Sequence, residues 1–389
     1  MRRLLPPAVV AAFPFLAAIL PAQDVLLHAR RIVTAPETVL ENGRVLIRQG
    51  KVAYVGDDIP AEARGRSRRV DYGDATIVPG FVLAQATLGQ GGDLAERALP
   101  FTPDLRAAEA CDPWHEDLMA LPALGVTALA LSPTAANVGG GLAALVKPGR
   151  ERGTVGSDLY LTLSLAPPAR QPERPPTSLL GAIDLLRSAF DLARSGLASG
   201  PDAAVLREAM QGARGVTVFA DSFAELTAAL DLGRDFGLRL VLVSASDAEK
   251  VLPRLVEQQA AVVLDSLRPG QRLAQLRLPT RLAEAGVPFC FGGDPKHLRL
   301  SAALAVQHGL DRRSALQALT RTPAVLLDRA AELGALRQGN AADFVVFTGD
   351  PLDLTSAHVA TWVDGQLVAG EAPAPRTTPE PTPAAMGER

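Results

Sequence analysis

Short apolar segments alternate with longer amphipathic segments from Pro79 to about residue 332, and this alternation limits the fold more than any other feature. Apolar runs with the length of buried strands lie at 76–84, 126–132, 158–165, 215–220, 239–244, 260–265 and 287–292. Amphipathic segments with the length of helices lie at 178–197, 201–212, 222–237, 247–258 and 276–285. Strands that alternate with helices predict βα units and a parallel sheet.

The spacing of these strands predicts an α/β fold of the (β/α)8 barrel type over residues 79–332. An eighth strand is expected to lie hidden in the interval 166–214. A doubly wound open sheet is the alternative architecture. It is less favoured because no glycine-rich dinucleotide-binding turn follows the first strand.

Extended patterning on both sides of the barrel predicts a second, smaller domain. Residues 24–78 alternate short apolar runs with turn glycines, which is typical of a small antiparallel sheet. Similar patterning returns at 333–372, so we expect one composite β-sandwich domain built from both ends of the chain. The Pro- and Thr-rich segment 373–389 is expected to be a disordered tail.

Residues 1–22 have the layout of a secretory signal peptide, because two arginines precede an apolar run that ends in small residues. An uncleaved membrane anchor is the alternative, but the run is short and is interrupted by Pro6, Pro7 and Pro14. We therefore expect a secreted or periplasmic protein with no membrane span after cleavage. The net charge of −3 lacks the basic excess of a nucleic-acid binder.

Two cysteines, Cys111 and Cys290, do not form a disulfide framework, and the sequence leaves open whether they pair. Cys111 and His115 have helical spacing in "CDPWHEDL", which would present both to one ion. Asp112 followed by Pro113 instead predicts a helix N-cap and first turn. We prefer the capping interpretation.

The glycine-rich segment "TAANVGGG" follows the second strand and is expected to be a loop. It lacks the Gly-Lys-Ser/Thr ending of a phosphate-binding P-loop, and Lys147 follows a strand-like "LAALV" run instead. No Gly-x-Ser-x-Gly elbow is present in the sequence. Ser132 and Ser244 are therefore interpreted as strand-end residues.

Several segments carry a family resemblance: "ATIVPGFVLAQATLG", "LGVTALALSPTAANVGGGLAALVKPG", "TSLLGAIDLLRSAF", "DLGRDFGLRLVLVSASDAEKVLPRL", "AGVPFCFGGDP" and, most specifically, "ALTRTPAVLLDRAAELGALRQGNAADFVVFTGDPLD". Together they resemble the amidohydrolase superfamily, and within it the secreted imidazolonepropionase-like proteins. The resemblance covers most of the chain after residue 22. It implies a metal-dependent hydrolase barrel with a β-sandwich domain, and a hydrolase that acts on C–N bonds.

The resemblance also implies where metal ligands would lie. Active relatives hold one or two divalent metals, zinc among them, at the C-terminal mouth of the barrel, where a His-x-His pair on the first strand aims two imidazoles at one ion. Gln85 and Thr87 occupy the matching positions here. The fifth-strand histidine falls at Phe219 and the sixth-strand histidine at Ser244, and only the eighth-strand aspartate remains, as Asp294.

A bridging carboxylated lysine has no candidate either, because no lysine occurs between Lys147 and Lys250. A catalytic zinc needs about three protein ligands, so we expect no metal and no other cofactor. An oxygen-only site for Ca²⁺ or Mg²⁺ is a weaker alternative, since most of the oxygen groups would be neutral. Asp294 is either a vestigial acid/base residue or a cap of the following loop, and His297 is either part of a rebuilt site or an ordinary loop histidine.

Three hypotheses about function follow. The first is a secreted pseudoenzyme that binds a small-molecule ligand in the former active-site mouth, or that serves as the non-catalytic partner of an intact amidohydrolase paralogue. The second is an imidazolonepropionase-like hydrolase of dipeptide or non-peptide C–N bonds, with a rebuilt or metal-free site that uses Asp294. The third is a structural or assembly role for the barrel surface.

Overall fold

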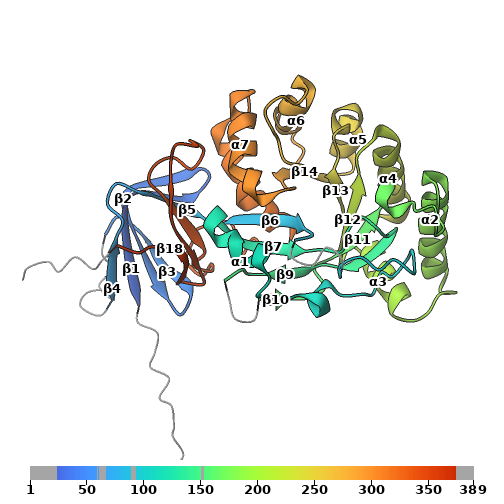
Figure 1. The fold of residues 1–389 in the computed structure, drawn as a ribbon, viewed down its shortest axis with the longest axis horizontal. Helices are drawn as coiled ribbons and strands as arrows, with labels where there is room; N and C mark the ends of the chain where they lie inside the picture. Colours follow the sequence, from blue (N-terminus) through green and yellow to red (C-terminus); the bar gives the residue numbers. More distant parts are fainter. Residues whose placement is uncertain (1–23, 59, 61–66, 89–92, 150–152, 374–389) are drawn as a thin grey trace, which may run out of the picture.

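The computed structural model describes residues 24–58, 60, 67–88, 93–149 and 153–373. A β-sheet formed by both ends of the chain lies beside an α/β region formed by the middle of the chain (Figure 1). The predicted signal peptide lies outside the described residues, and so does the predicted tail apart from Pro373.

The strands of the terminal sheet are β1 (Val25–Ala35), β2 (Thr38–Arg48), β3 (Lys51–Gly56), β4 (Arg68–Asp71), β5 (Thr76–Pro79), β16 (Phe344–Phe347), β17 (His358–Val363) and β18 (Gln366–Gly370). The strands of the α/β region are β6 (Phe81–Ala86), β7 (Val126–Leu131), β8 (Gly139–Leu142), β9 (Ala144–Val146), β10 (Thr154–Gly156), β11 (Tyr160–Ser164), β12 (Gly215–Ala220), β13 (Leu240–Ser244), β14 (Ala261–Leu264) and β15 (Phe289–Phe291). Its helices are α1 (Glu116–Ala120), α2 (Leu179–Ser195), α3 (Pro201–Met210), α4 (Phe223–Phe236), α5 (Leu252–Glu257), α6 (Leu273–Glu284), α7 (Leu298–Gln307), α8 (Arg312–Leu319) and α9 (Arg321–Leu326).

The terminal sheet follows the order β18-β17-β16-β5-β1-β2-β3, with β4 also paired to β1. The expectation of a purely antiparallel sheet at the N-terminal end is wrong in part, because β4 and β5 both run parallel to β1. After β3 the chain returns to the other side of β1 and runs beside it in the same direction, which antiparallel hairpins alone do not do.

The two ends of the chain share one core within this sheet. β16 pairs antiparallel with β5, so that Phe344 lies opposite Pro79. The ring of Phe344 stacks on buried Trp362 with 5.5 Å between centroids, and the indole Nε1 of Trp362 donates to the hydroxyl of Tyr72 at 2.8 Å. Because buried aromatic rings contribute much of the apolar area removed from water, neither end of the chain would complete this core alone.

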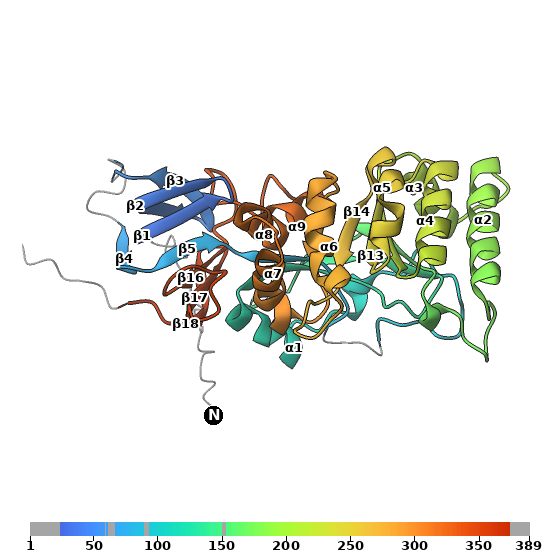
Figure 2. The same ribbon diagram turned by 90° about the horizontal axis from the view of Figure 1, so that it is seen from above.

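The α/β region contains each of the seven predicted strands, although the first is divided at Gly80 into β5 and β6. Helices α2, α4, α5, α6 and α7 stand in a row along one face of the strands (Figures 1 and 2). Among the described residues, no backbone pairing joins β15 to β6, but α9 contacts both strands. In the part of the chain that the structure describes, no helix is both long and apolar enough to cross a membrane.

The hidden strand expected in 166–214 is wrong, because this interval holds the short helix η4 (Pro167–Ala169), α2 and α3. The place between β7 and β11 is taken instead by the glycine-rich segment. β9 pairs antiparallel with β7, and β8 pairs antiparallel with β11. The two short strands between β7 and β11 therefore run antiparallel to their neighbours. The alternation of strands and helices along the sequence does not reveal this.

The glycines of this segment form β8 and serve close packing, so the expectation that they belong to a loop is wrong. The amide of Thr102 donates to the carbonyl of Gly139 at 2.9 Å, and the amide of Leu142 donates to Leu105 at 2.7 Å. A Cβ at Gly139 would lie 2.4 Å from the ring of Phe101. At Gly141, where φ is +116°, it would lie 2.4 Å from the carbonyl of Leu105.

Capping residues mark the ends of α4 and the start of α2. The Ser222 hydroxyl accepts from the amide of Glu225, whose carboxylate accepts from the Ser222 amide, so α4 starts with a capping box. The same helix ends at Gly237, where φ is +67°. The Ser178 hydroxyl caps the start of α2 by accepting from the amide of Gly181.

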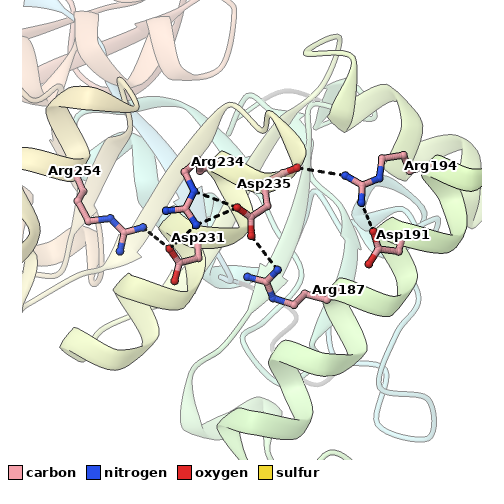
Figure 3. Close-up of polar contacts among 7 residues, drawn as sticks. All are labelled: Arg187, Asp191, Arg194, Asp231, Arg234, Asp235 and Arg254. Carbon is pink, nitrogen blue, oxygen red and sulfur yellow. Dashed lines mark hydrogen bonds and ion pairs between the residues drawn. The ribbon is translucent and has the colours of Figure 1, made fainter.

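On the outer surface, alternating charges join α2, α4 and α5 (Figure 3). Arg187 of α2 lies 2.9 Å from Asp235 of α4, and Arg254 of α5 lies 2.7 Å from Asp231 of α4. Because exposed pairs contribute little individually, this network orients the helices and adds only modestly to stability.

Candidate functional site

The carboxyl ends of the parallel strands place polar side chains along one edge of the α/β region. Ala220 of β12 pairs with Ser244 of β13, which in turn pairs with Leu264 of β14. The residues that follow, Asp221 and Asp265, therefore come to the same edge as Ser244. In open and closed α/β folds this edge is where ligands bind.

Gln85 and Thr87 lie at the end of β6, where the pairing with β7 is irregular between Leu83 and Ala86. The neighbouring Ala86 packs in the outer apolar cluster beneath the helices. Gln85 is 7% exposed, and Thr87 is partly exposed. Ala84 belongs to the inner apolar cluster and Ala86 to the outer one, so the irregular end of β6 departs from the simple alternation of a regular strand.

Phe219 lies near the end of β12 and is 8% exposed. It belongs to an inner apolar cluster with Val243 of β13, Val263 of β14 and Cys290 of β15. Its ring therefore occupies the interior with carbon atoms and supplies no donor to a metal.

Ser244 ends β13 in an unusual backbone conformation, with φ of +74°, and Ala245 follows with φ of +47°. Two consecutive non-glycine residues at positive φ store backbone strain, which is found most often at functional sites. The amide of Ala245 donates to the carbonyl of Ala220 at 3.1 Å, which holds this turn against β12. The conformation places the Ser244 hydroxyl within hydrogen-bonding reach of Asp265.

Asp265 is an acid with a raised pKa at this edge. Burial raises the pKa of its carboxyl above the ordinary value, the hydrogen bond from Ser244 lowers it, and the nearby charge of Asp221 raises it further. Asp221 itself accepts from the amide of Ser246 at 2.9 Å and from the Ser246 hydroxyl.

A small cavity of about 240 Å³ opens between these groups. It is lined by Asp221, Ser244, Ser246, Leu264, Asp265, Ser266, Leu267, Gln271, Gln275 and Leu278. The lining contains two carboxylates, hydroxyls and side-chain amides but no lysine or arginine. The cavity is therefore suited to a small ligand that donates hydrogen bonds.

Asp294 follows β15 and caps the short helix η6 (Pro295–His297). Its carboxylate accepts from the Lys296 amide at 3.0 Å and lies 3.1 Å from Nδ1 of His297. Its backbone amide donates to the hydroxyl of Ser266 at 2.9 Å. The carboxylate is thus held by its own turn.

The N-cap in the segment after Cys111 is His115, so the expectation that Asp112 is the helix N-cap is wrong. The carboxylate of Asp112 accepts from the Trp114 amide at 2.9 Å, and His115 is the N-cap of α1, accepting from the Asp117 amide at 3.3 Å. Both cysteines are free, with Cys290 buried and Cys111 partly exposed. This answers the question that the sequence left open.

Comparison of the sequence with known proteins finds a match to one family. The sequence model of the Amidohydrolase family matches residues 189–369. The amidohydrolase tasK of Hapsidospora irregularis is 39% identical over 70 residues, which are 18% of this chain and 7% of that protein. This chain therefore spans only a small part of that curated relative.

Solved structures agree with the family match. An amidohydrolase from Thermotoga maritima superposes with a TM-score of 0.81 at 22% identity, covering 89% of this chain and all of that one (100%). An ochratoxinase from A. niger has a TM-score of 0.57 at 17% identity, covering 91% of this chain and 97% of that one. At these identities the likeness concerns the fold alone.

The match of residues 189–369 to the family model, together with the shared fold, supports membership of the amidohydrolase superfamily.

The donor chemistry at the expected ligand positions of this chain does not match zinc. Gln85, Thr87 and Ser244 offer neutral oxygen or amide groups, Phe219 offers none, and the carboxylate of Asp294 is engaged by its own turn. In the described ranges, no group of three or more His, Cys, Asp or Glu side chains is arranged to hold a metal ion.

Sequence reasoning missed Asp221 and Asp265, which the structure brings together beside Ser244. The signal was present, because each acid directly follows a buried strand, in "VTVFAD" and "AAVVLD". Gln85, Thr87, Phe219 and Asp294 do not line this cavity. The predicted vestigial site and the observed cavity therefore share only Ser244.

Proposed function

We propose that this amidohydrolase-superfamily chain is a secreted or periplasmic pseudoenzyme that binds a small polar ligand at the carboxyl ends of β12, β13 and β14. The observation that carries the proposal is the loss of metal donors. Gln85, Thr87, Phe219 and Ser244 stand where the resemblance implies histidines. Because zinc is held by imidazole, thiolate or carboxylate groups, this donor set would not retain it.

The chemistry of the cavity defines the class of ligand. Asp221, Asp265 and the hydroxyls of Ser244 and Ser246 line it without any cationic side chain. A ligand with N–H donors, such as an amine or a small amide, would satisfy these acceptors, and its volume must fit about 240 Å³. An anionic ligand would be repelled by the two acids.

A metal-free hydrolase of dipeptide or non-peptide C–N bonds is the second candidate, and the Asp294–His297 pair favours it. The two side chains lie 3.1 Å apart, so the carboxylate orients the imidazole and leaves Nε2 available as a base. This reading requires Asp294 to act through His297, since its other carboxylate oxygen caps η6.

Metal content and hydrolysis measured on the same preparation test the proposal. We expect substoichiometric zinc after incubation with zinc and desalting, and no turnover of N-acyl amino acids, dipeptides or imidazolones. Stoichiometric zinc with turnover would refute the pseudoenzyme. Metal-free turnover that is abolished by Asp294→Ala would establish the second candidate.

Ligand binding is tested by thermal shift with a panel of small amines and amides. Asp265→Asn should abolish the shift given by the best ligand. Asp74→Asn is the matched control, because Asp74 is almost fully exposed on the terminal sheet. Equal shifts in both variants would exclude the cavity as the binding site, and co-purification with an intact paralogue would then favour a partner role.

A further inference from the structure

A second cavity, of about 610 Å³, lies between the terminal sheet and the α/β region. Its lining comes from the β2–β3 turn, from the end of β9, from the segment after α9 and from the β17–β18 turn. Leu131 at the end of β7 pairs with Ala144, and Leu129 pairs with Val146, so β9 runs away from the mouth. The cavity therefore lies toward the opposite end of the strands from the acidic pocket, which is the cavity of about 240 Å³ lined by Asp221 and Asp265. Its volume is in the range of small-molecule sites.

A buried ion cluster forms one wall of this cavity. The Lys147 ammonium is 2.8 Å from Asp343 and 2.6 Å from Asp364, and Lys147 is 5% exposed. Asp343 also accepts from the amide of Asp364 at 2.7 Å. Burial raises the pKa of Asp343, and Lys147 opposes that rise. Because Lys147 is committed to two carboxylates, it fixes the wall and leaves ligand recognition to other groups.

Three further charged side chains line the cavity without such partners. Lys51 comes from the start of β3, and Arg329 and Glu332 come from the segment after α9. Within the described ranges, none of the three forms an ion pair. The side-chain amides of Gln49 and Gln366 add neutral hydrogen-bonding groups to the same lining.

This arrangement selects a ligand by its charges. A carboxylate would be satisfied by Lys51 and Arg329, since guanidinium groups bind carboxylates with two parallel hydrogen bonds. An ammonium group would be satisfied by Glu332. A purely anionic ligand would be repelled by Glu332. A neutral ligand would form no ion pair with any of the three side chains.

We propose that this cavity binds a small zwitterion of amino-acid or dipeptide size, with its carboxylate on Lys51 and Arg329 and its ammonium group on Glu332. The site is separate from the acidic pocket and does not depend on the function proposed for that pocket.

Isothermal titration calorimetry of the full chain with alanylalanine, up to about 10 mM, tests the proposal. We expect saturable binding that weakens about tenfold or more in Arg329→Gln and in Glu332→Gln. The blocked, uncharged analogue N-acetylalanine methylamide should not bind. Arg30→Gln is the matched control, because Arg30 is exposed and lies 3.7 Å from Asp74 on the terminal sheet.

Three outcomes would overturn the proposal: no binding of the dipeptide, equal affinity in both cavity variants and the control, or equal binding of the blocked analogue. Asp265→Asn separates the two sites, because loss of dipeptide binding in that variant alone would assign the dipeptide to the acidic pocket. Circular dichroism of each variant checks that a lost signal does not come from unfolding.

Discussion

Replacement of Asp202 by asparagine should make the protein more stable at neutral and alkaline pH. Asp202 lies in the first turn of α3, where the helix dipole would ordinarily favour a charged carboxylate. Its pKa is instead raised from 3.8 to about 6. Burial is the largest cause of this rise, and the other causes are a hydrogen bond with the Asp104 side chain and repulsion from the Asp104 charge. The folded state therefore favours the protonated acid.

The direction of the pH dependence follows from this rise. A carboxyl that has a higher pKa when folded than when unfolded stabilises the protein fully below about pH 4, and this contribution is lost as the pH rises through about 6. The rise from 3.8 to about 6 corresponds to roughly 3 kcal/mol at most. Because Asp202 is partly exposed to solvent, we expect about 1–2 kcal/mol.

Urea unfolding followed by circular dichroism, at about pH 4 and about pH 8, measures the effect. The wild-type free energy of unfolding should fall by about 1–2 kcal/mol more than that of Asp202→Asn over this range. Asp74→Asn is the control, because its carboxylate is 93% exposed. Parallel pH profiles for wild type and Asp202→Asn would refute the reasoning.

Three further substitutions test the packing by chemical denaturation. Lys147→Met should lower the free energy of unfolding by about 3–5 kcal/mol, because it removes the ammonium group that pairs with the buried carboxylate of Asp343. Adding Asp343→Asn should recover part of the loss, and no recovery would contradict this. Phe219→Ala should cost about 3–5 kcal/mol because it opens an interior cavity, and a loss below about 1 kcal/mol would mean that the ring is not packed as described. Arg187→Ala should cost less than about 1 kcal/mol, and a larger loss would show that the outer charge network is cooperative.

Local signals account for the parts of the fold that the sequence predicts well. The strand at 215–220 has its predicted bounds, and α4 begins after Ser222 and ends before Gly237, as the N-cap and C-terminal glycine indicate. Such elements are specified by residues within one or two turns of their ends. Their prediction needs no knowledge of what packs against them.

Non-local pairing accounts for the parts that the sequence did not predict. The segment "VGGGL" resembles a loop, because glycine is a poor strand former. It becomes β8 because residues 100–106 and β11 pair with its two edges, and only glycine admits the backbone of Leu105 beside Gly141. The parallel placement of β4 and β5 beside β1 likewise depends on the path of the whole chain.

The sequence predicts which residues stand at the expected ligand positions, but it does not predict the contact between Asp265 and Ser244. The absence of histidines at Gln85, Thr87, Phe219 and Ser244 is visible in the sequence alone. The pairing of Asp265 with Ser244 is not, because it depends on the positive φ of Ser244 and on the register between β13 and β14.

The position of the polar groups limits where the ligand proposed for the acidic pocket can bind. Phe219, Val243, Val263 and Cys290 fill the interior between the strands with apolar atoms, where a metal and its water would otherwise need charged or hydrogen-bonding partners. The acids lie at the strand ends, and the cavity that they line extends to Gln275 and Leu278 of α6. The ligand proposed for this cavity would therefore bind at the rim between β13, β14 and α6, so substitutions at Gln85 and Thr87 should leave its affinity unchanged while Asp265→Asn removes it.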